Sequence, residues 1–214
     1  MEEAVWETPR DVKTALGHLG LTIEPLQVAV QAGYYAYISR TANDAPSAAG
    51  YYQWNDTIRA LRELYVPDGW TRHDQKGFPT ILNPGKTIAL CVYSGNENTG
   101  RPGRPLSTKN AKGPCTEHLV ESNALTLFDL APAPEPVRLS RDGGTIPTWA
   151  LVFYNDAREI RSEIALPVFI KDGRIEHWAK RIILPAIPHE PDDYKRIIEP
   201  DFGPDIDIDI RRRA

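Results

Sequence analysis

The sequence predicts an α+β protein in which a helical N-terminal third packs on an antiparallel sheet. Apolar residues recur at helical spacing in the first third, and they alternate with a period of two from residue 160 to residue 170. Nineteen of the 214 residues are proline, about twice the usual share, which favours short elements over a helical bundle. A single domain is expected, in which residues 1–70 are helical, residues 71–187 are mainly β and residues 188–214 form an extended acidic tail.

The composition excludes several classes of protein. Hydrophobic residues make up 41% and charged residues 25% of the chain, as in ordinary folded proteins. The formal net charge of −4 excludes a uniformly basic protein that coats nucleic acid. No stretch approaches the roughly 18 to 20 apolar residues of a membrane span, and the acidic start does not resemble a signal peptide. Cys91 and Cys115 cannot build a disulfide framework, so both are expected to be reduced thiols of a cytoplasmic protein.

Three helices are predicted in the N-terminal third. The first begins after the N-cap Thr8 and ends at Gly20, which suits a left-handed C-terminal position. The second opens at Pro25 and carries the strongest periodic signal in the chain. Its periodic residues are Leu26, Ala29, Val30, Gly33, Tyr34, Tyr37 and Ile38. After a loop of small residues, the third helix is predicted from Asn55 to Tyr65.

The remainder is predicted to be mainly β. Short strands are expected at 80–83 and 86–93, and an antiparallel meander is expected from 149 to 184. Within the meander, Asp172 and Gly173 form a strong hairpin turn signal, and Pro167 indicates an edge position or a bulge.

Between these β regions, the segment 116–130 shows helical spacing, although residues 125–130 are equally compatible with a strand. The segment 94–114 has no periodicity. Such long aperiodic connections are uncommon in compact domains, and they are usually functional or disordered.

This aperiodic segment is the leading functional candidate. Residues 98–113 contain no acid in a chain that is acidic overall, and their glycines allow close backbone approach to a ligand. The predicted helix that follows would offer free N–H groups, which favour anions. Four cationic side chains are therefore predicted to bind the phosphate groups of a nucleic acid or a nucleotide: Arg101, Arg104, Lys109 and Lys112.

Aromatic residues cluster between residues 34 and 54, close to several arginines. Such a combination can hold a single nucleic-acid strand by stacking bases and neutralising phosphates. Tyr51, Tyr52 and Arg59 are therefore supporting candidates. Helical spacing places Tyr34 and Tyr37 in the core, so packing is the favoured explanation for the cluster as a whole.

The first two helices also have the layout of a helix-turn-helix, because a glycine-containing turn joins them. Gln27 and Gln31 could then pair with adenine in the major groove. The second helix has no Arg or Lys before Arg40, although phosphate neutralisation dominates affinity for DNA. A helical hairpin packed on the sheet is therefore the favoured interpretation.

Metal-binding alternatives rest on scattered carboxylates and histidines. Asp156, Glu159 and Glu163 lie close in sequence, as in a metal-dependent hydrolase. In a strand, however, Glu159 and Glu163 share the face opposite Ile160, so the solvent face of a sheet is the favoured interpretation. Cys115 and His118 have the spacing of half a zinc site, and the remaining ligands would have to come from distant histidines.

The end of the chain alternates acidic and apolar residues. In an extended strand, the acids would point one way and the apolar residues the other. The apolar stripe is expected to dock on a sheet edge, in this chain or in a partner. The acidic stripe could instead mimic a phosphate backbone. The alternating residues are Asp205, Ile206, Asp207, Ile208, Asp209 and Ile210.

The sequence therefore predicts binding rather than catalysis, and it predicts no cofactor and no association with a membrane. The favoured function is that of a cytoplasmic accessory protein that binds nucleic acid or a nucleotide phosphate through the cationic segment. One alternative is a protein-interaction or inhibitor component, such as a mobile-element accessory factor, that docks through its acidic C-terminal strand. The second alternative is a metal-dependent hydrolase.

Overall fold

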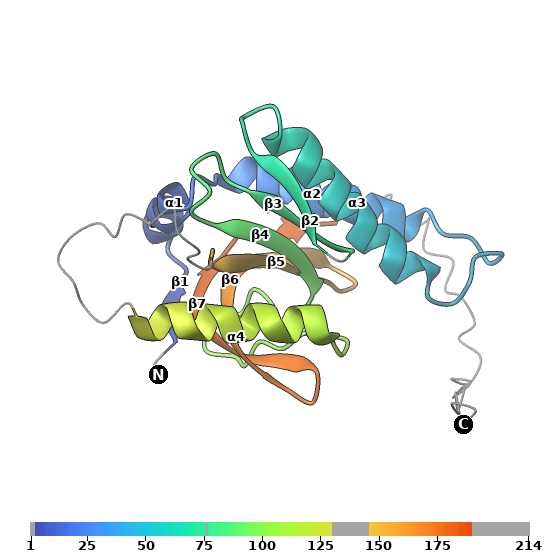
Figure 1. The fold of residues 1–214 in the computed structure, drawn as a ribbon. Helices are drawn as coiled ribbons and strands as arrows, with labels where there is room; N and C mark the ends of the chain where they lie inside the picture. Colours follow the sequence, from blue (N-terminus) through green and yellow to red (C-terminus); the bar gives the residue numbers. More distant parts are fainter. Residues whose placement is uncertain (1–2, 76, 130–145, 190–214) are drawn as a thin grey trace, which may run out of the picture.

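An eight-stranded sheet forms the centre of the molecule, and helices cover both of its faces (Figure 1). The computed structural model describes residues 3–75, 77–129 and 146–189. Three helices lie on one face and the fourth lies on the other: α1 (Pro9–His18), α2 (Ile23–Ile38), α3 (Ala48–Tyr65) and α4 (Pro114–Asp129). The predicted α+β class and the helical N-terminal third are confirmed.

The strands pair in the order β1-β7-β6-β5-β4-β3-β2, and β8 pairs with β6. Their bounds are β1 (Ala4–Trp6), β2 (Thr71–Gln75), β3 (Phe78–Leu82), β4 (Ala89–Ser94), β5 (Thr148–Asn155), β6 (Glu159–Lys171), β7 (Arg174–Ile183) and β8 (Ile187–Pro188). Strands β5, β6 and β7 form the predicted antiparallel meander.

The sheet as a whole is mixed, which corrects the prediction of an antiparallel sheet. Strand β4 runs parallel to β5, and β1 runs parallel to β7. Parallel neighbours need a long crossover connection, and the chain between β4 and β5 supplies one because it contains α4. Local alternation in the sequence does not reveal such a crossover.

The turn between β6 and β7 follows the prediction closely. Asp172 and Gly173 have φ values of 50° and 73°, as a two-residue hairpin of the mirror-image turn type requires. The pairing of β6 with β7 shifts register on both sides of Pro167. The predicted irregularity at this proline is therefore present as a bulge.

Helix α1 begins and ends where the sequence predicts. The Oγ1 of Thr8 accepts a hydrogen bond from the backbone N–H of Asp11 at 3.3 Å, which satisfies one free donor of the first turn. Val12 and Leu16 are buried one turn apart. Gly20 then adopts a φ of 69°, a left-handed conformation that ends the helix.

Helices α2 and α3 form an interlocked pair. Helix α2 starts two residues before the predicted Pro25, and its buried residues all belong to the predicted periodic set. Helix α3 starts at Ala48, seven residues before the predicted Asn55. This corrects the predicted loop, because packing against α2 stabilises turns that the local sequence alone does not specify. Tyr51 and Tyr52 are consequently helical.

The sheet separates two apolar cores. The core on the side of α1–α3 includes Leu26, Val30, Leu61, Leu151, Phe153 and Ile164. The core on the side of α4 includes Cys91, Leu106, Val120, Val152, Ile175 and Trp178. Because Leu106 belongs to the chain between β4 and α4, that connection contributes to the second core.

Candidate anion-binding loop

The chain between β4 and α4, residues 95–113, forms a loop that folds back on itself; we call it the cationic loop. The backbone N–H of Asn96 donates to the carbonyl oxygen of Ser107 at 2.9 Å. Gly95 and Thr108 form an isolated antiparallel bridge. The aperiodic segment therefore has a defined path, although no pattern in the sequence predicts it.

The cationic loop is also attached to the sheet beneath it. Leu106 is 1% exposed in the core on the side of α4. Its carbonyl oxygen accepts a hydrogen bond from Trp178 Nε1 at 3.0 Å. Further along, the backbone N–H of Lys112 donates to the carbonyl oxygen of Gly173 at 2.6 Å. These contacts hold the second half of the loop against the β6–β7 hairpin.

A buried arginine of β6 holds the first half. The Nε of Arg161 donates to the carbonyl oxygen of Thr99 at 3.0 Å, and its Nη2 donates to that of Glu97 at 3.0 Å. Its Nη1 binds the carboxylates of Asp156 at 2.9 Å and Glu159 at 3.1 Å. The guanidinium therefore joins two loop carbonyls to the turn between β5 and β6.

A fully buried ion pair holds the tip of the loop. Arg181 Nε donates to a carboxylate oxygen of Glu163 at 2.6 Å. The Nη1 of Arg181 donates to the carbonyl oxygen of Arg104 at 2.8 Å, and its Nη2 donates to that of Arg101 at 3.3 Å. Glu163 also accepts from the backbone N–H of Gly100 at 2.8 Å. One ion pair thus fixes the loop at three backbone positions.

Burial and ion pairing shift the pKa values of the Glu163 and Asp156 carboxyl groups in opposite directions. Burial raises the pKa of the Glu163 carboxyl, and the paired guanidinium opposes that rise. The pKa of Asp156 is also raised by burial, but the backbone N–H groups of Arg158 and Glu159, together with Arg161, outweigh burial and lower it. Buried ions are costly unless their polar atoms are hydrogen-bonded, and the loop carbonyls provide many of those bonds here.

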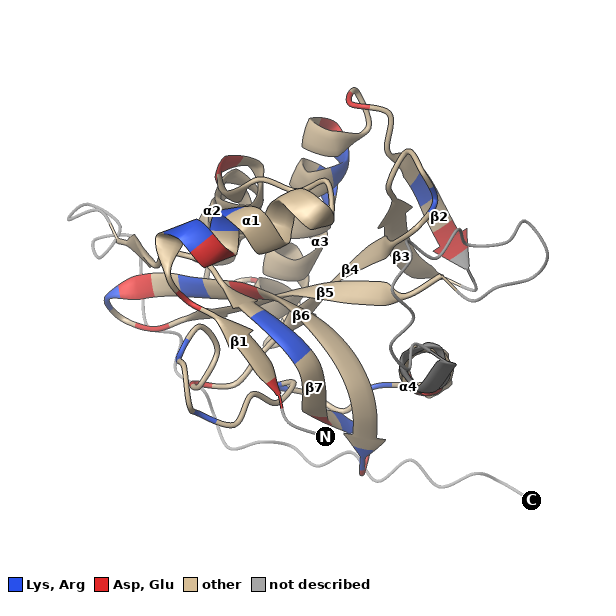
Figure 2. Cartoon of the chain, turned by 90° about the vertical axis from the view of Figure 1, so that its left-hand side faces the viewer, with Lys and Arg blue, Asp and Glu red and all other residues tan. Residues whose placement is uncertain are grey.

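Three of the four predicted cations remain exposed to solvent. Arg101, Arg104 and Lys109 are exposed, and within the described residues no ion pair joins them to a carboxylate. The basic segments of the loop lie on the α4 side of the sheet, away from α1–α3 (Figure 2). Their carbonyl anchors face inward, so the side chains of Arg101 and Arg104 start from fixed points of the backbone.

Lys112 differs from the other three cations. Its side chain is half-buried, and its Nζ lies 4.9 Å from the centroid of the Tyr93 ring. Burial lowers the pKa of this amine. The aromatic face offsets some of the cost of removing the charge from water. Lys112 adds positive charge at the end of the cationic loop, beside the start of α4.

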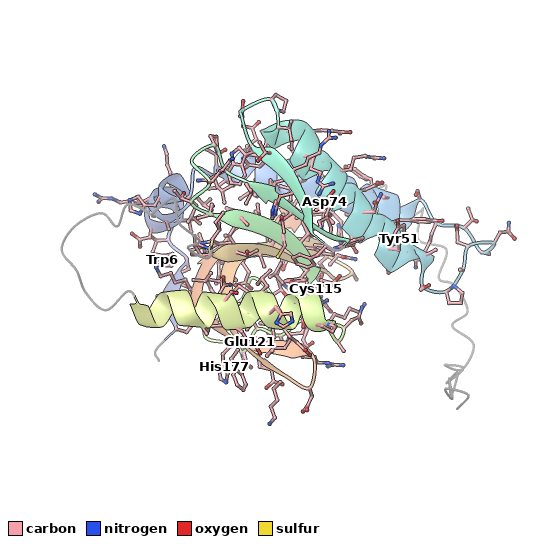
Figure 3. All side chains as sticks on the ribbon, in the orientation of Figure 1. Trp6, Tyr51, Asp74, Cys115, Glu121 and His177 are labelled. Atoms are coloured by element: carbon pink, nitrogen blue, oxygen red, sulfur yellow. The ribbon has the colours of Figure 1, made fainter. Side chains whose placement is uncertain are left out.

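The aromatic candidates lie elsewhere. Tyr51 is 58% exposed, and it lies on α3, on the side of the sheet opposite α4 (Figure 3). The hydroxyl of Tyr52 donates to Asp44 at 2.8 Å, and Arg59 pairs with Asp56 at 3.3 Å. The structure therefore does not bring Tyr51, Tyr52 and Arg59 together with the cationic loop.

Helix α2 and its two glutamines, the residues of the helix-turn-helix hypothesis, make contacts within the chain. Helix α2 contacts α3 and strands β5 and β6, as a helical hairpin on the sheet requires. The Nε2 of Gln27 donates to the carbonyl oxygen of Pro185 at 2.9 Å, and Gln31 donates to the hydroxyl of Tyr35 at 3.4 Å.

The metal-site candidates need correction. The sequence places Glu163 on the solvent face of a sheet with Glu159, but Glu163 is fully buried because the cationic loop covers that face of β6. Asp156 and Glu159 both bind Arg161. Among the residues that the structure describes, no group of three or more His, Cys, Asp or Glu can hold a metal ion. Among the same described residues, no further ligands complete the half zinc site of Cys115 and His118.

The sequence does not predict that Arg161 and Arg181 hold the cationic loop. Other charged residues stand beside both arginines in the sequence, Glu159 and Glu163 in β6 and Lys180 in β7, so no local pattern distinguishes the buried charges from exposed ones. The other predicted interaction site, Asp205 to Ile210, lies outside the described residues.

Comparison of the chain with protein-family models, with curated proteins and with solved structures gave no match. Among the described helices, none has the length and the apolar character needed to cross a membrane. The candidate site is therefore interpreted from its own geometry and chemistry.

Proposed function

We propose that this chain is a cytoplasmic accessory protein that binds the phosphate groups of a nucleic acid or a nucleotide through the cationic loop. Arg101, Arg104 and Lys109 make the contacts, and Lys112 adds positive charge beside them. The observation that carries the proposal is the combination of an anchored backbone with exposed cations. Arg181 holds the carbonyls of Arg101 and Arg104, while no carboxylate among the described residues neutralises their side chains.

An anchored backbone favours binding for an entropic reason. Ordering a loop on association costs free energy, and a loop that is already ordered avoids that cost. A guanidinium is suited to phosphate because its parallel N–H groups match two phosphate oxygens. Arg101 and Arg104 lie three residues apart on backbone that Arg181 holds at both positions, so we expect both side chains to contact the same ligand.

The proposed role is one of binding and not of catalysis. The carboxylates that a hydrolase would need are engaged by Arg161 and Arg181. Tyr51, Tyr52 and Arg59 lie on the other side of the sheet, so they do not contribute to the same contact. The observations therefore favour the cationic loop over the metal-dependent alternative.

The triple variant Arg101→Ala/Arg104→Ala/Lys109→Ala tests the proposal. Binding of fluorescent single-stranded and duplex oligonucleotides, and of ATP, should be measured across a series of salt concentrations. The parental protein should bind at least one of these probes with an affinity that falls as salt rises. In the variant the slope of log affinity against log salt should decrease by roughly two to three, because about one counterion is released per phosphate contact.

A matched control removes the same charge elsewhere. Arg10, Lys13 and Lys86 are exposed and lie outside the cationic loop. The variant Arg10→Ala/Lys13→Ala/Lys86→Ala should retain most of the affinity and the slope. Equal losses in both variants would mean that net charge, and not the loop, governs binding. Affinity that does not depend on salt, or no binding of any probe, would refute the proposed function.

A further inference from the structure

Strand β2 lies at the border of the sheet and has a free edge. It pairs with β3 on one side, and no described strand pairs with its other side (Figure 2). The register with β3 runs from Thr71 to Gln75 without a shift, and β2 contains no proline. A bulge or a proline usually protects such an edge from pairing with another chain, and β2 has neither.

The hydrogen bonds of the sheet show which backbone groups β2 offers at this edge. The N–H of Asn83, directly after β3, donates to the carbonyl oxygen of Ile88 at 3.2 Å, so position 83 points its backbone groups toward β4. Backbone groups alternate in direction along a strand, so Thr80 points toward β2, where it lies opposite His73. The backbone groups of His73 therefore point toward β3, and those of its two neighbours in β2 point outward.

We propose that β2 is a dimerisation edge, on which the β2 strand of a second copy of this chain pairs antiparallel about a two-fold axis at His73. In this register Arg72 of each copy lies opposite Asp74 of the other. Both residues have outward-pointing backbone groups, so each of these pairs exchanges two backbone hydrogen bonds. The proposal does not depend on the function of the cationic loop, which lies against β6 and β7.

The charges of β2 favour pairing with its own copy. Arg72 and Asp74 lie two positions apart, so their side chains share one face of the sheet. Asp74 pairs with Arg62 of α3, and its side chain is still 52% exposed. Because a carboxylate has two oxygens that accept several donors, Asp74 can also bind the guanidinium of Arg72 from the other copy. Opposite charges at facing positions of two antiparallel strands stabilise their pairing.

The arrangement of residues in β2 selects one register. Strands that pair about a two-fold axis need complementary residues at positions symmetric about the centre. Around His73, the first symmetric positions carry opposite charges, and the next two, Thr71 and Gln75, are polar and uncharged. An axis at Arg72 or at Asp74 would instead place two like charges opposite each other, which destabilises a strand pair.

A cysteine at the symmetry centre tests this register. Opposite residues whose backbone groups point away from each other have Cα atoms about 4.5 Å apart, within the range of a disulfide. In the full chain with Cys115→Ser, His73→Cys should therefore give a disulfide-linked dimer under mild oxidation, measured on a non-reducing gel. Thr71→Cys is the matched control, because its two copies are offset by about 13 Å along the strands and should remain unlinked.

Charge reversal tests the complementarity. Sedimentation velocity over a concentration series should show a monomer–dimer equilibrium for the parental chain. Arg72→Glu and Asp74→Lys should each weaken dimerisation about tenfold or more, since each places like charges opposite each other at two positions. An equimolar mixture of the two variants should associate again as a heterodimer, because both facing pairs then have opposite charges.

The control for net charge is Lys13→Glu on α1, where the lysine is exposed; this variant should dimerise like the parental chain. A parental chain that remains monomeric throughout the series would overturn the inference. A dimer that neither reversal weakens, or a mixture that does not associate, would place the interface elsewhere and overturn it too. Equal cross-linking at positions 73 and 71 would have the same meaning, because it would show contact without a defined register.

Discussion

Individual buried side chains explain why the cationic loop has one conformation. Arg161, Glu163 and Arg181 are almost completely inaccessible to water. Each bonds to loop backbone atoms as well as to an opposite charge. Arginine suits this role because its planar group donates in several directions at once. The buried charged side chains therefore form hydrogen bonds with N–H and carbonyl groups of the loop backbone, which apolar side chains cannot do.

The two cysteines should differ sharply in reactivity. Cys91 is 1% exposed, and burial raises the pKa of its thiol to about 12. At pH 8 its thiolate fraction is therefore about a thousandfold lower than that of an ordinary thiol. Maleimide should label Cys115 in the native protein and label Cys91 only after unfolding in denaturant, as counted by intact mass. Rapid double labelling of the native protein would contradict the buried position of Cys91.

The sequence predicts some of these residues and not others. Cys91 lies in an apolar run, so its burial follows from the sequence. The burial of Glu163 does not follow from the sequence. Alternation shows which residues share a face of a strand, but it does not show what covers that face. The cover is the cationic loop, whose path depends on contacts with Arg161 and Arg181, more than 60 residues away along the chain.

At the scale of elements, close packing between α2 and α3 depends on Gly33. A Cβ atom added to Gly33 would lie 2.6 Å from the backbone carbonyl oxygen of Gln53. It would also collide with the side chain of Thr57, which is fully buried. Backbone atoms cannot move aside as a flexible side chain can, so the two helices would have to separate.

A pair of glycine substitutions tests this contact. Gly33→Ala should lower the free energy of unfolding by about 1–3 kcal/mol, as overpacking of a core usually does. Gly17, in α1, has no atom within 4 Å of the added Cβ, so Gly17→Ala should raise stability by about 0.5–1 kcal/mol through helix propensity. Urea denaturation measures both values. Equal effects of the two substitutions would exclude the close approach at Gly33.

The predictable elements are those whose signals are local. Helix α1 has its cap, its apolar spacing and its terminal glycine within one segment, and the β6–β7 turn has Asp172 and Gly173. Strand β2 is polar throughout, and β1 is three residues long, so neither presents a pattern. The early start of α3 at Ala48 likewise depends on its contact with α2 and not on a local cap, since Ser47 makes no side-chain cap bond.

At the scale of the whole molecule, the sheet separates two sides of the protein that differ in structure. The side of α1–α3 holds the larger apolar core. The other side combines α4 with the cationic loop (Figure 2). Strands β6 and β7 connect the two sides, because their alternate residues enter the apolar core on one side and hold the loop on the other. Stability and the proposed binding are therefore linked through the same two strands.

The ion pair between Glu163 and Arg181 allows this link to be tested. Glu163→Leu and Arg181→Met should each lower the free energy of unfolding by about 3–5 kcal/mol. Glu163→Leu leaves the buried Arg181 with only the partly exposed carboxylate of Glu3, at 3.5 Å, and Arg181→Met leaves the buried Glu163 without a cation. The double variant should lose much less than the sum of the two single losses, since no fully buried charge remains unpaired. Denaturant titration of the four proteins gives the coupling.

Binding by the same proteins separates folding from function. The folded double variant lacks the groups that hold Gly100 and the carbonyls of Arg101 and Arg104. Its affinity for the oligonucleotide or nucleotide that binds the parental protein should therefore fall about tenfold, because the freed loop must be ordered on binding. Additive losses of stability would show that the two side chains act independently. A stable double variant with parental affinity would show that the cationic loop does not need these anchors to bind.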